Sequence, residues 1–256
     1  PAVTPPRLEG RDAGFAEGGD RGSLRLRDSD VALIRAVAAA NPRTVVAIQA
    51  GSAVVMSEWL DEVPAVVQAW YAGCRAGAGL ADVLVGEVVP SGRLPFSVPA
   101  DEADLPPFDR DATSFRYDRW HGWWHLARTG TPPAFPFGFG LSYTSFELGV
   151  PDVAVAGDTI EVAVPARNRG DRSGADVVQV YATLPDPDAP ARLVGFARVE
   201  VDAGATVVAE VRVPVERLAT RDAATHTWQP ASGRHLITVA RHADDAAATT
   251  VDVDLP

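Results

Sequence analysis

Apolar positions in the first third of the chain follow two patterns, helical spacing and continuous β-branched runs. The spacing after Asp28 predicts a helix that ends near Asn41, because Pro42 disfavours helical backbone in the residue before it. The run 44–48 (TVVAI) shows no alternation, which is typical of a strand buried on both faces of a parallel sheet. Residues 65–71 (AVVQAWY) predict a second strand of the same kind.

Two further helices are expected in this part, at 53–60 and at 76–86, and Asp28, Ser29 and Asp30 are candidate caps of the first helix. The order helix, strand, helix, strand, helix predicts an α/β layer arrangement with right-handed crossovers. Two strands are too few for a stable open sheet. The pattern therefore predicts part of an α/β domain with a parallel sheet.

The pattern changes after Tyr143 to short alternating strands separated by Gly, Asp and Pro. The expected strands are 159–165, 175–183, 193–201, 206–214 and 234–241. This spacing predicts an antiparallel, immunoglobulin-like β-sandwich of roughly a hundred residues. Apolar side chains occupy both faces of 175–183, with Val178 on one face and Val177 on the other, so this strand is expected at the centre of its sheet.

Composition and charge narrow the classes of partner. The 46% of hydrophobic residues suit packed cores, and 34 acidic against 23 basic residues give a net charge of -11. This charge argues against a nucleic-acid surface or an anionic-membrane surface. No apolar run has the length that a membrane span needs, and the single cysteine, Cys74, cannot form an internal disulfide. The sequence does not decide between a cytoplasmic and a secreted location. The start at Pro1 predicts a fragment or a processed product.

Three segments together carry a family resemblance. The first runs from Glu17-Gly-Gly-Asp20-Arg21 to NPRTVVAIQAGSAV, the second from VPAVVQAWYAG to GRLPFSVP, and the third is FPFGFGLSYTSFEL with the sandwich after it. In this order they resemble the C-terminal part of glycoside hydrolase family 3. The resemblance implies a partial α/β sandwich domain at 1–100, an aromatic-rich segment at 101–140 and a fibronectin type III-like sandwich at 141–256.

The resemblance also implies a chemistry. Family members are retaining, β-glucosidase-like enzymes that cleave β-linked sugars with two carboxylates, which must lie about 5 to 5.5 Å apart. The nucleophilic Asp would belong to a (β/α)8 barrel that would precede this chain. The general acid/base Glu matches Glu17, on a Gly-rich loop, while Asp20 and Arg21 would fix that loop and Glu9 ranks second. The implied substrate is a small β-glycoside or oligosaccharide, with no cofactor or metal, and the oligomeric state stays open.

The sequence departs from the family pattern at several positions. Gly19 stands where an aromatic residue is usual, and Cys74 and Arg75 replace a Gln-Glu pair. His121 and His125 have the i, i+4 spacing of a metal site, but no third ligand accompanies them, which favours packing and surface hydrogen bonds. A dense aromatic set suits packing between domains better than a platform for stacking sugars: Phe115, Tyr117, Trp120, Trp123, Trp124, Phe135, Phe137 and Phe139.

Three functions follow from the sequence. The first is the C-terminal portion of a retaining β-glycosidase, which by itself is expected to hydrolyse nothing because the nucleophile is on another domain. The second is a non-catalytic carbohydrate-binding module, and the third is a structural role in bracing other domains.

Overall fold

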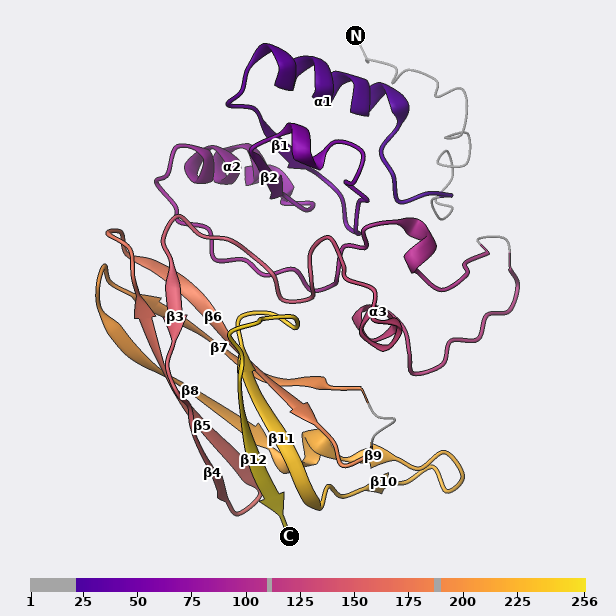
Figure 1. The fold of residues 1–256 in the computed structure, drawn as a ribbon, viewed down its shortest axis with the longest axis vertical. Helices are drawn as coiled ribbons and strands as arrows, with labels where there is room; N and C mark the ends of the chain where they lie inside the picture. Colours follow the sequence, from indigo (N-terminus) through magenta and orange to yellow (C-terminus); the bar gives the residue numbers. More distant parts are fainter. Residues whose placement is uncertain (1–21, 110–111, 187–189) are drawn as a thin grey trace. The chain divides into compact units, whose positions relative to one another are not determined.

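A computed structural model describes residues 22–109, 112–186 and 190–256. The chain forms two compact units, which are described separately. The first comprises residues up to 71 together with 98–134, and the second comprises 72–97 together with 135–256 (Figure 1). An α/β part followed by an all-β part was predicted, and this fold class is confirmed. The predicted domain boundaries at 100 and 140 stay predictions.

The first unit contains the predicted helix and the predicted parallel strand pair. Helix α1 spans Asp28–Ala40, strand β1 spans Val45–Ile48 and strand β2 spans Ala65–Gln68. The two strands pair in parallel, with Val45 opposite Ala65. None of the three predicted capping residues caps α1, because its N-cap is Arg27, which makes no side-chain cap bond. Strand β2 is also shorter than expected.

The prediction of a helix at 53–60 is wrong. The segment holds only the start of a 3₁₀ turn, η1 (Leu60–Glu62). Its apolar side chains form much of the core of the unit, because Val54, Val55, Met56 and Trp59 are all at most 4% exposed. Three consecutive buried residues do not fit a surface helix, which buries one face only. Tertiary packing decides the local structure here.

Strands β1 and β2 are less buried than the sequence predicts. Val45 is 42% exposed and only Ile48 of β1 is fully buried. A strand buried on both faces needs layers above and below it. Among the described residues this sheet has two strands only.

Short helices follow in the 98–134 part of the first unit. The 3₁₀ turn η3 spans Glu102–Asp104 and is closed by reciprocal bonds of Asp101 and Asp104, the capping-box arrangement. Helix α3 spans Trp123–Thr129 and ends at Gly130. Gly130 has a left-handed φ of 66°, which glycine adopts without a steric cost.

The second unit is a β-sandwich preceded by a short helical segment. The 3₁₀ turn η2 (Gly73–Arg75) leads into α2 (Ala76–Leu84). One sheet has the order β12-β11-β6-β7. Its strands are β6 (Gly174–Thr183), β7 (Arg192–Val201), β11 (Gly233–Ala240) and β12 (Thr249–Leu255). The central position predicted for 175–183 is confirmed.

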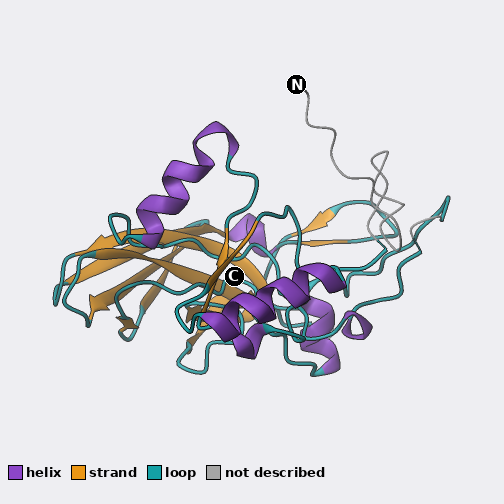
Figure 2. Ribbon diagram, turned by 90° about the horizontal axis from the view of Figure 1, so that it is seen from above, coloured by secondary structure: helices purple, strands orange, loops and turns teal. Residues whose placement is uncertain are grey.

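The other sheet is organised around β5 (Thr159–Asn168). Strands β3 (Phe146–Leu148) and β4 (Asp152–Ala156) pair with successive parts of β5, and β8 (Thr206–Pro214) also pairs with it. A 3₁₀ turn, η4 (Val215–Leu218), follows β8. The small hairpin of β9 (Thr220–Arg221) and β10 (Trp228–Gln229) stands apart from both sheets. Figure 2 shows helix in a few separate segments and most of the strand in the sandwich.

The core of the sandwich lies between its two sheets. Alternate residues of β5, including Ile160 and Val164, are buried against Val178 and Val180 of β6 and Ile237 of β11. Each fully buried side chain of this size contributes about 1.5 to 3 kcal/mol of transfer free energy. Among the described residues, no helix combines the length and the apolar character that crossing a membrane requires.

Candidate functional site

The predicted catalytic residue lies outside the described residues, as do its neighbours. Glu17, Asp20, Arg21 and the second-ranked Glu9 all precede Gly22, where the description begins. The assignment of Glu17 therefore stays a prediction. The described part of the site begins with the segment that follows these residues along the chain.

Residues Ser23–Arg25 are tied to η3 through a single carboxylate oxygen. Oε1 of Glu102 accepts a hydrogen bond of 2.6 Å from the Ser23 hydroxyl and one of 3.1 Å from the backbone N–H of Arg25. The backbone N–H of Leu24 donates to the same oxygen. We call this arrangement, Ser23–Arg25 with Glu102, the carboxylate clamp. Glu102 is not predictable from the sequence, because nothing in the spacing of residues nearly eighty positions apart indicates the contact.

The side chain of Arg25 adds a second layer of contacts. Its guanidinium lies 2.6 Å from Oδ2 of Asp101 and 3.3 Å from Oε1 of Glu58. On the backbone, the Leu24 carbonyl accepts a hydrogen bond of 2.9 Å from the N–H of Val55. The hydrogen bond from the N–H of Ala103, together with the charge of Arg25, holds the pKa of Asp101 below its usual value, against a smaller opposing effect of desolvation. Asp101 thus carries a negative charge for Arg25 at neutral pH.

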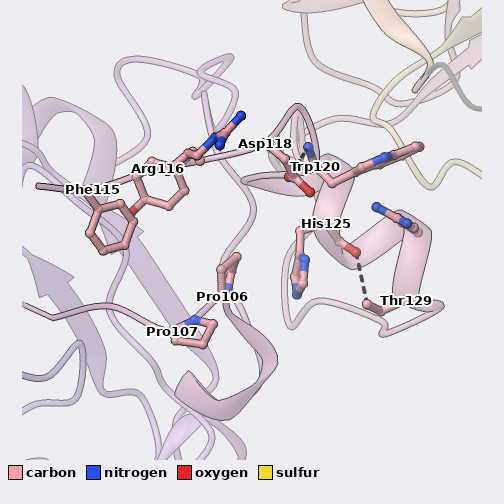
Figure 3. A pocket seen from close by; sticks show the side chains of 10 residues that line it. Pro106, Pro107, Phe115, Arg116, Asp118, Trp120, His125 and Thr129 are labelled. Carbon is pink, nitrogen blue, oxygen red and sulfur yellow. Dashed lines mark hydrogen bonds between the residues drawn. The ribbon is translucent and has the colours of Figure 1, made fainter.

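An aromatic hollow occupies another part of the first unit. It has a volume of about 490 Å³ and is lined by Pro106, Pro107, Phe115, Arg116, Tyr117, Asp118, Trp120, His125, Arg128 and Thr129. Figure 3 shows Phe115 on one side of the space and His125 on the other, with Pro106 and Pro107 along one edge. Phe115 and Tyr117 are 44% and 56% exposed, and their ring centroids are 4.4 Å apart. The hollow thus combines accessible aromatic faces with polar groups.

Polar side chains of the hollow are held by short local contacts. The N–H of Trp120 donates a hydrogen bond of 2.7 Å to Oδ1 of Asp118. The Arg128 guanidinium lies over the Trp120 ring, 4.8 Å from its centroid, in a cation–π geometry. Nδ1 of His121 is 2.9 Å from the Asp118 carbonyl. Since α3 begins at Trp123, His121 and His125 do not belong to one helix.

The aromatic residues that are dense in the sequence between 115 and 139 divide between the two units. Phe115, Tyr117 and the three tryptophans belong to the first unit, whereas Phe135, Phe137 and Phe139 belong to the second. Phe135 and Phe139 lie 5.3 Å apart, between ring centroids. The set is therefore not one continuous cluster within either unit.

A second polar cluster joins the segment 93–97 to the sandwich. Arg93 and Asp176 form an ion pair in which Asp176 is 1% exposed. Nearby, Arg241 bonds Asp245 through Nε and Nη2, both at 2.9 Å. Although burial favours the neutral acid, the hydrogen bonds from Arg241 and from the backbone hold the pKa of Asp245 well below its usual value. Burial lowers the pKa of His242. The cluster fixes loops to strand β6 and is a structural element.

Buried Gln179 completes this attachment. Its Nε2 donates to the carbonyl of Gly138 at 3.0 Å and to that of Arg241 at 2.5 Å, and the Tyr181 hydroxyl donates to its Oε1 at 2.6 Å. The Phe137–Phe139 segment is also bonded to Leu94 and to Ala243. Cys74 is exposed and free. Among the described residues, no cluster of three or more His, Cys, Asp or Glu side chains could hold a metal ion.

Comparison with known protein families identifies both parts of the chain. The model described as glycosyl hydrolase family 3 C-terminal domain matches residues 9–143, more than half of the chain. The chain belongs to glycoside hydrolase family 3. A fibronectin type III-like domain matches residues 176–243, which covers strands of both sheets of the sandwich.

Known relatives of this family 3 chain are longer proteins. It is 41% identical over 252 residues to beta-glucosidase B of Emericella nidulans, covering 90% of the chain and 30% of the relative. It is 34% identical to a xylan 1,4-beta-xylosidase of Xylanibacter ruminicola, covering 91% and 27%. The beta-glucosidase DesR of Streptomyces venezuelae, solved with D-glucose, is similar in structure with a TM-score of 0.82 at 36% identity, over 93% of this chain and 32% of that one. The chain thus spans about a third of the length of the relatives it matches.

Proposed function

We propose that this chain is the C-terminal portion of a retaining β-glycosidase of the β-glucosidase type, and that it supplies the general acid/base, Glu17. The observation that carries the proposal is the family match over residues 9–143, which includes the Glu17-Gly-Gly-Asp20-Arg21 motif. The nucleophile belongs to a barrel domain of the same protein, outside this chain. The substrate is a terminal β-linked glucoside or a related small oligosaccharide.

In this mechanism Glu17 acts twice. As an acid it protonates the glycosidic oxygen while the nucleophile forms a covalent bond to the anomeric carbon, and as a base it then activates the water that hydrolyses the intermediate. A general acid needs a carboxyl pKa raised toward the working pH, which exclusion of water from a closed cleft provides. A carboxylate on a Gly-rich loop can reach into a cleft formed with another domain.

The test uses the full-length protein that carries this chain. Glu17→Ala removes proton donation, so kcat/KM for a glycoside with a poor leaving group should fall by about 10²- to 10⁴-fold. An aryl glycoside with a good leaving group needs little protonation and should lose far less in its glycosylation step. Azide should restore turnover of the second substrate. Equal losses on both substrates, or no loss, would contradict the assignment.

The aromatic hollow supports a second candidate function, a carbohydrate-binding surface. Exposed rings at Phe115 and Tyr117 offer faces for sugar stacking, and Asp118 and His125 add polar groups beside them. The isolated chain would then bind a β-glucan oligosaccharide in a calorimetric titration, and Tyr117→Ala would abolish binding. Trp228→Ala is the matched control, because Trp228 is an exposed ring of the second unit that lies near Arg221. Absence of binding by the unmodified chain would exclude this function.

A further inference from the structure

The carboxylate clamp fixes the chain a short distance after the proposed acid/base. One oxygen of Glu102 collects donors from three successive residues, the Ser23 hydroxyl at 2.6 Å and the N–H groups of Leu24 and Arg25. The Ser23 hydroxyl also accepts from the Arg25 N–H at 3.1 Å. Hydrogen bonds to an ionised acceptor are stronger than hydrogen bonds between two neutral groups. Together they fix both the position and the direction of this short segment.

The clamp has a rigid support. The Leu24 carbonyl is bonded to Val55, whose side chain is fully buried in the core of the first unit. Glu102 belongs to η3, whose first turn is closed by Asp101 and Asp104. Arg25 connects the two supports, because its guanidinium contacts both Glu58 and Asp101. The segment Ser23–Arg25 is therefore held between two parts of the unit that are far apart in sequence.

Helix α1 has separate anchors and does not depend on Glu102 alone. Arg35 of α1 pairs with Glu62 at 2.8 Å and bonds the Glu58 carbonyl at 2.5 Å. Val31 is buried on the helix face. Exposed ion pairs such as Arg35–Glu62 add little to stability. Because α1 has these anchors of its own, the three donors on Glu102 serve the placement of Ser23–Arg25 rather than the attachment of the helix.

We propose that Glu102 is a positioning residue for catalysis: it fixes the point from which the chain runs back to Glu17. This inference rests on the proposed function. Ser23 is six positions after Glu17 in the sequence, so covalent geometry limits the span between them to about 20 Å. A misplacement of a reacting group by about 1 Å can cost about 10²-fold in rate. Loosening the clamp should therefore impair proton donation. In this role Glu102 acts through the position of Glu17 and does not touch the substrate.

The experiment compares Glu102→Ala and Glu102→Gln with Glu17→Ala in the full-length protein, using aryl β-glucosides with a poor and a good leaving group. Glu102→Ala should lower kcat/KM by about 10- to 100-fold for the poor leaving group and less than about threefold for the good one. Glu102→Gln keeps an acceptor oxygen and should show a smaller loss with the same selectivity. Glu62→Ala removes an exposed ion pair of the same unit and should affect neither substrate.

Circular dichroism checks that each variant is folded, and Glu102→Gln carries the test if Glu102→Ala does not fold. Equal losses on both substrates in the folded Glu102 variants, while Glu17→Ala retains its selectivity, would overturn the positioning role and leave the proposed function intact. Unselective loss in Glu17→Ala would instead overturn the proposed function, and the positioning role with it.

Discussion

The guanidinium of Arg93 and the carboxylate of Asp176 form an ion pair across 83 positions of sequence, with Asp176 almost completely buried. Asp176→Ala leaves the Arg93 charge, itself only 12% exposed, without this partner. Breaking a buried ion pair from one side costs about 3 to 5 kcal/mol. We expect the free energy of unfolding of the chain, measured by urea denaturation, to fall by that amount. Asp252→Asn is the control, because the Asp252 pair with Arg234 is exposed and its loss should leave the urea midpoint unchanged. Similar midpoints for both variants would show that the buried pair is not structural.

Gly138 has a left-handed φ of 81° and lies against Gln179. A Cβ at this position would be 2.8 Å from Cδ of Gln179, whose side chain is held by its own hydrogen bonds. Gly138→Ala should therefore lower the free energy of unfolding by about 2 to 4 kcal/mol, from overpacking and backbone strain together. At Gly157, with a φ of 63° and no atom near the added carbon, alanine brings the backbone cost alone, about 1 to 2 kcal/mol. Urea midpoints of the two variants compare the effects directly, and equal losses would contradict the steric argument.

Tyr181 makes the sandwich sensitive to alkali. Burial, reinforced by the negative charge of Asp244, raises the pKa of Tyr181 well above its usual value. The unfolded chain then loses this proton at about pH 10 while the folded chain keeps it, so the unfolded state is favoured as the pH rises above about 10. The free energy of unfolding should fall with pH in this range.

Tyr181→Phe tests the alkaline effect. The variant should lose about 1 kcal/mol at neutral pH, because the hydrogen bond to Gln179 is removed, but should show a weaker decline above about pH 10. Tyr71→Phe, at a ring that is 79% exposed, should leave the pH dependence unchanged. Urea denaturation at a series of alkaline pH values is the measurement. An unchanged slope in Tyr181→Phe would refute the role given to this residue.

Features of the fold that depend on neighbouring residues were predicted better than features that depend on contacts between residues far apart in sequence. Apolar residues on both faces of 175–183 placed β6 at the centre of its sheet, because burial on both faces leaves a direct mark on the sequence. Strand β12 was missed, since Asp252 and Asp254 lower its β propensity, and its place at the edge of the sheet comes from pairing with β11. The segment 53–60 has helical composition, yet the core of the first unit takes up its apolar side chains.

The candidate site was predictable only in part. Glu17 comes from a local motif, which sequence alone can display. Glu102 has no such motif, and its role depends on a contact with Ser23 that the fold creates. Likewise, the hollow beside Trp120 draws on prolines and aromatic residues whose shared surface the spacing does not indicate.

The isolated chain is expected to hydrolyse no β-glycoside. A retaining mechanism needs two carboxylates on opposite sides of the anomeric carbon, and the proposed nucleophile is not in this chain. Incubation of the purified chain with an activated aryl β-glucoside should release no phenolate above the buffer rate. Turnover by the isolated chain that disappears in Glu17→Ala would contradict a divided active site.

The central claim is that Glu17 is the general acid/base of a retaining enzyme. Its most direct test is to identify the product that Glu17→Ala forms from an activated aryl β-glucoside in the presence of azide, in the full-length protein. Without the carboxylate of Glu17, azide can attack the glycosyl–enzyme intermediate on the face that water would use. The account predicts a glucosyl azide of β configuration, detected by nuclear magnetic resonance. Formation of no azide adduct, or of the α anomer, would contradict it.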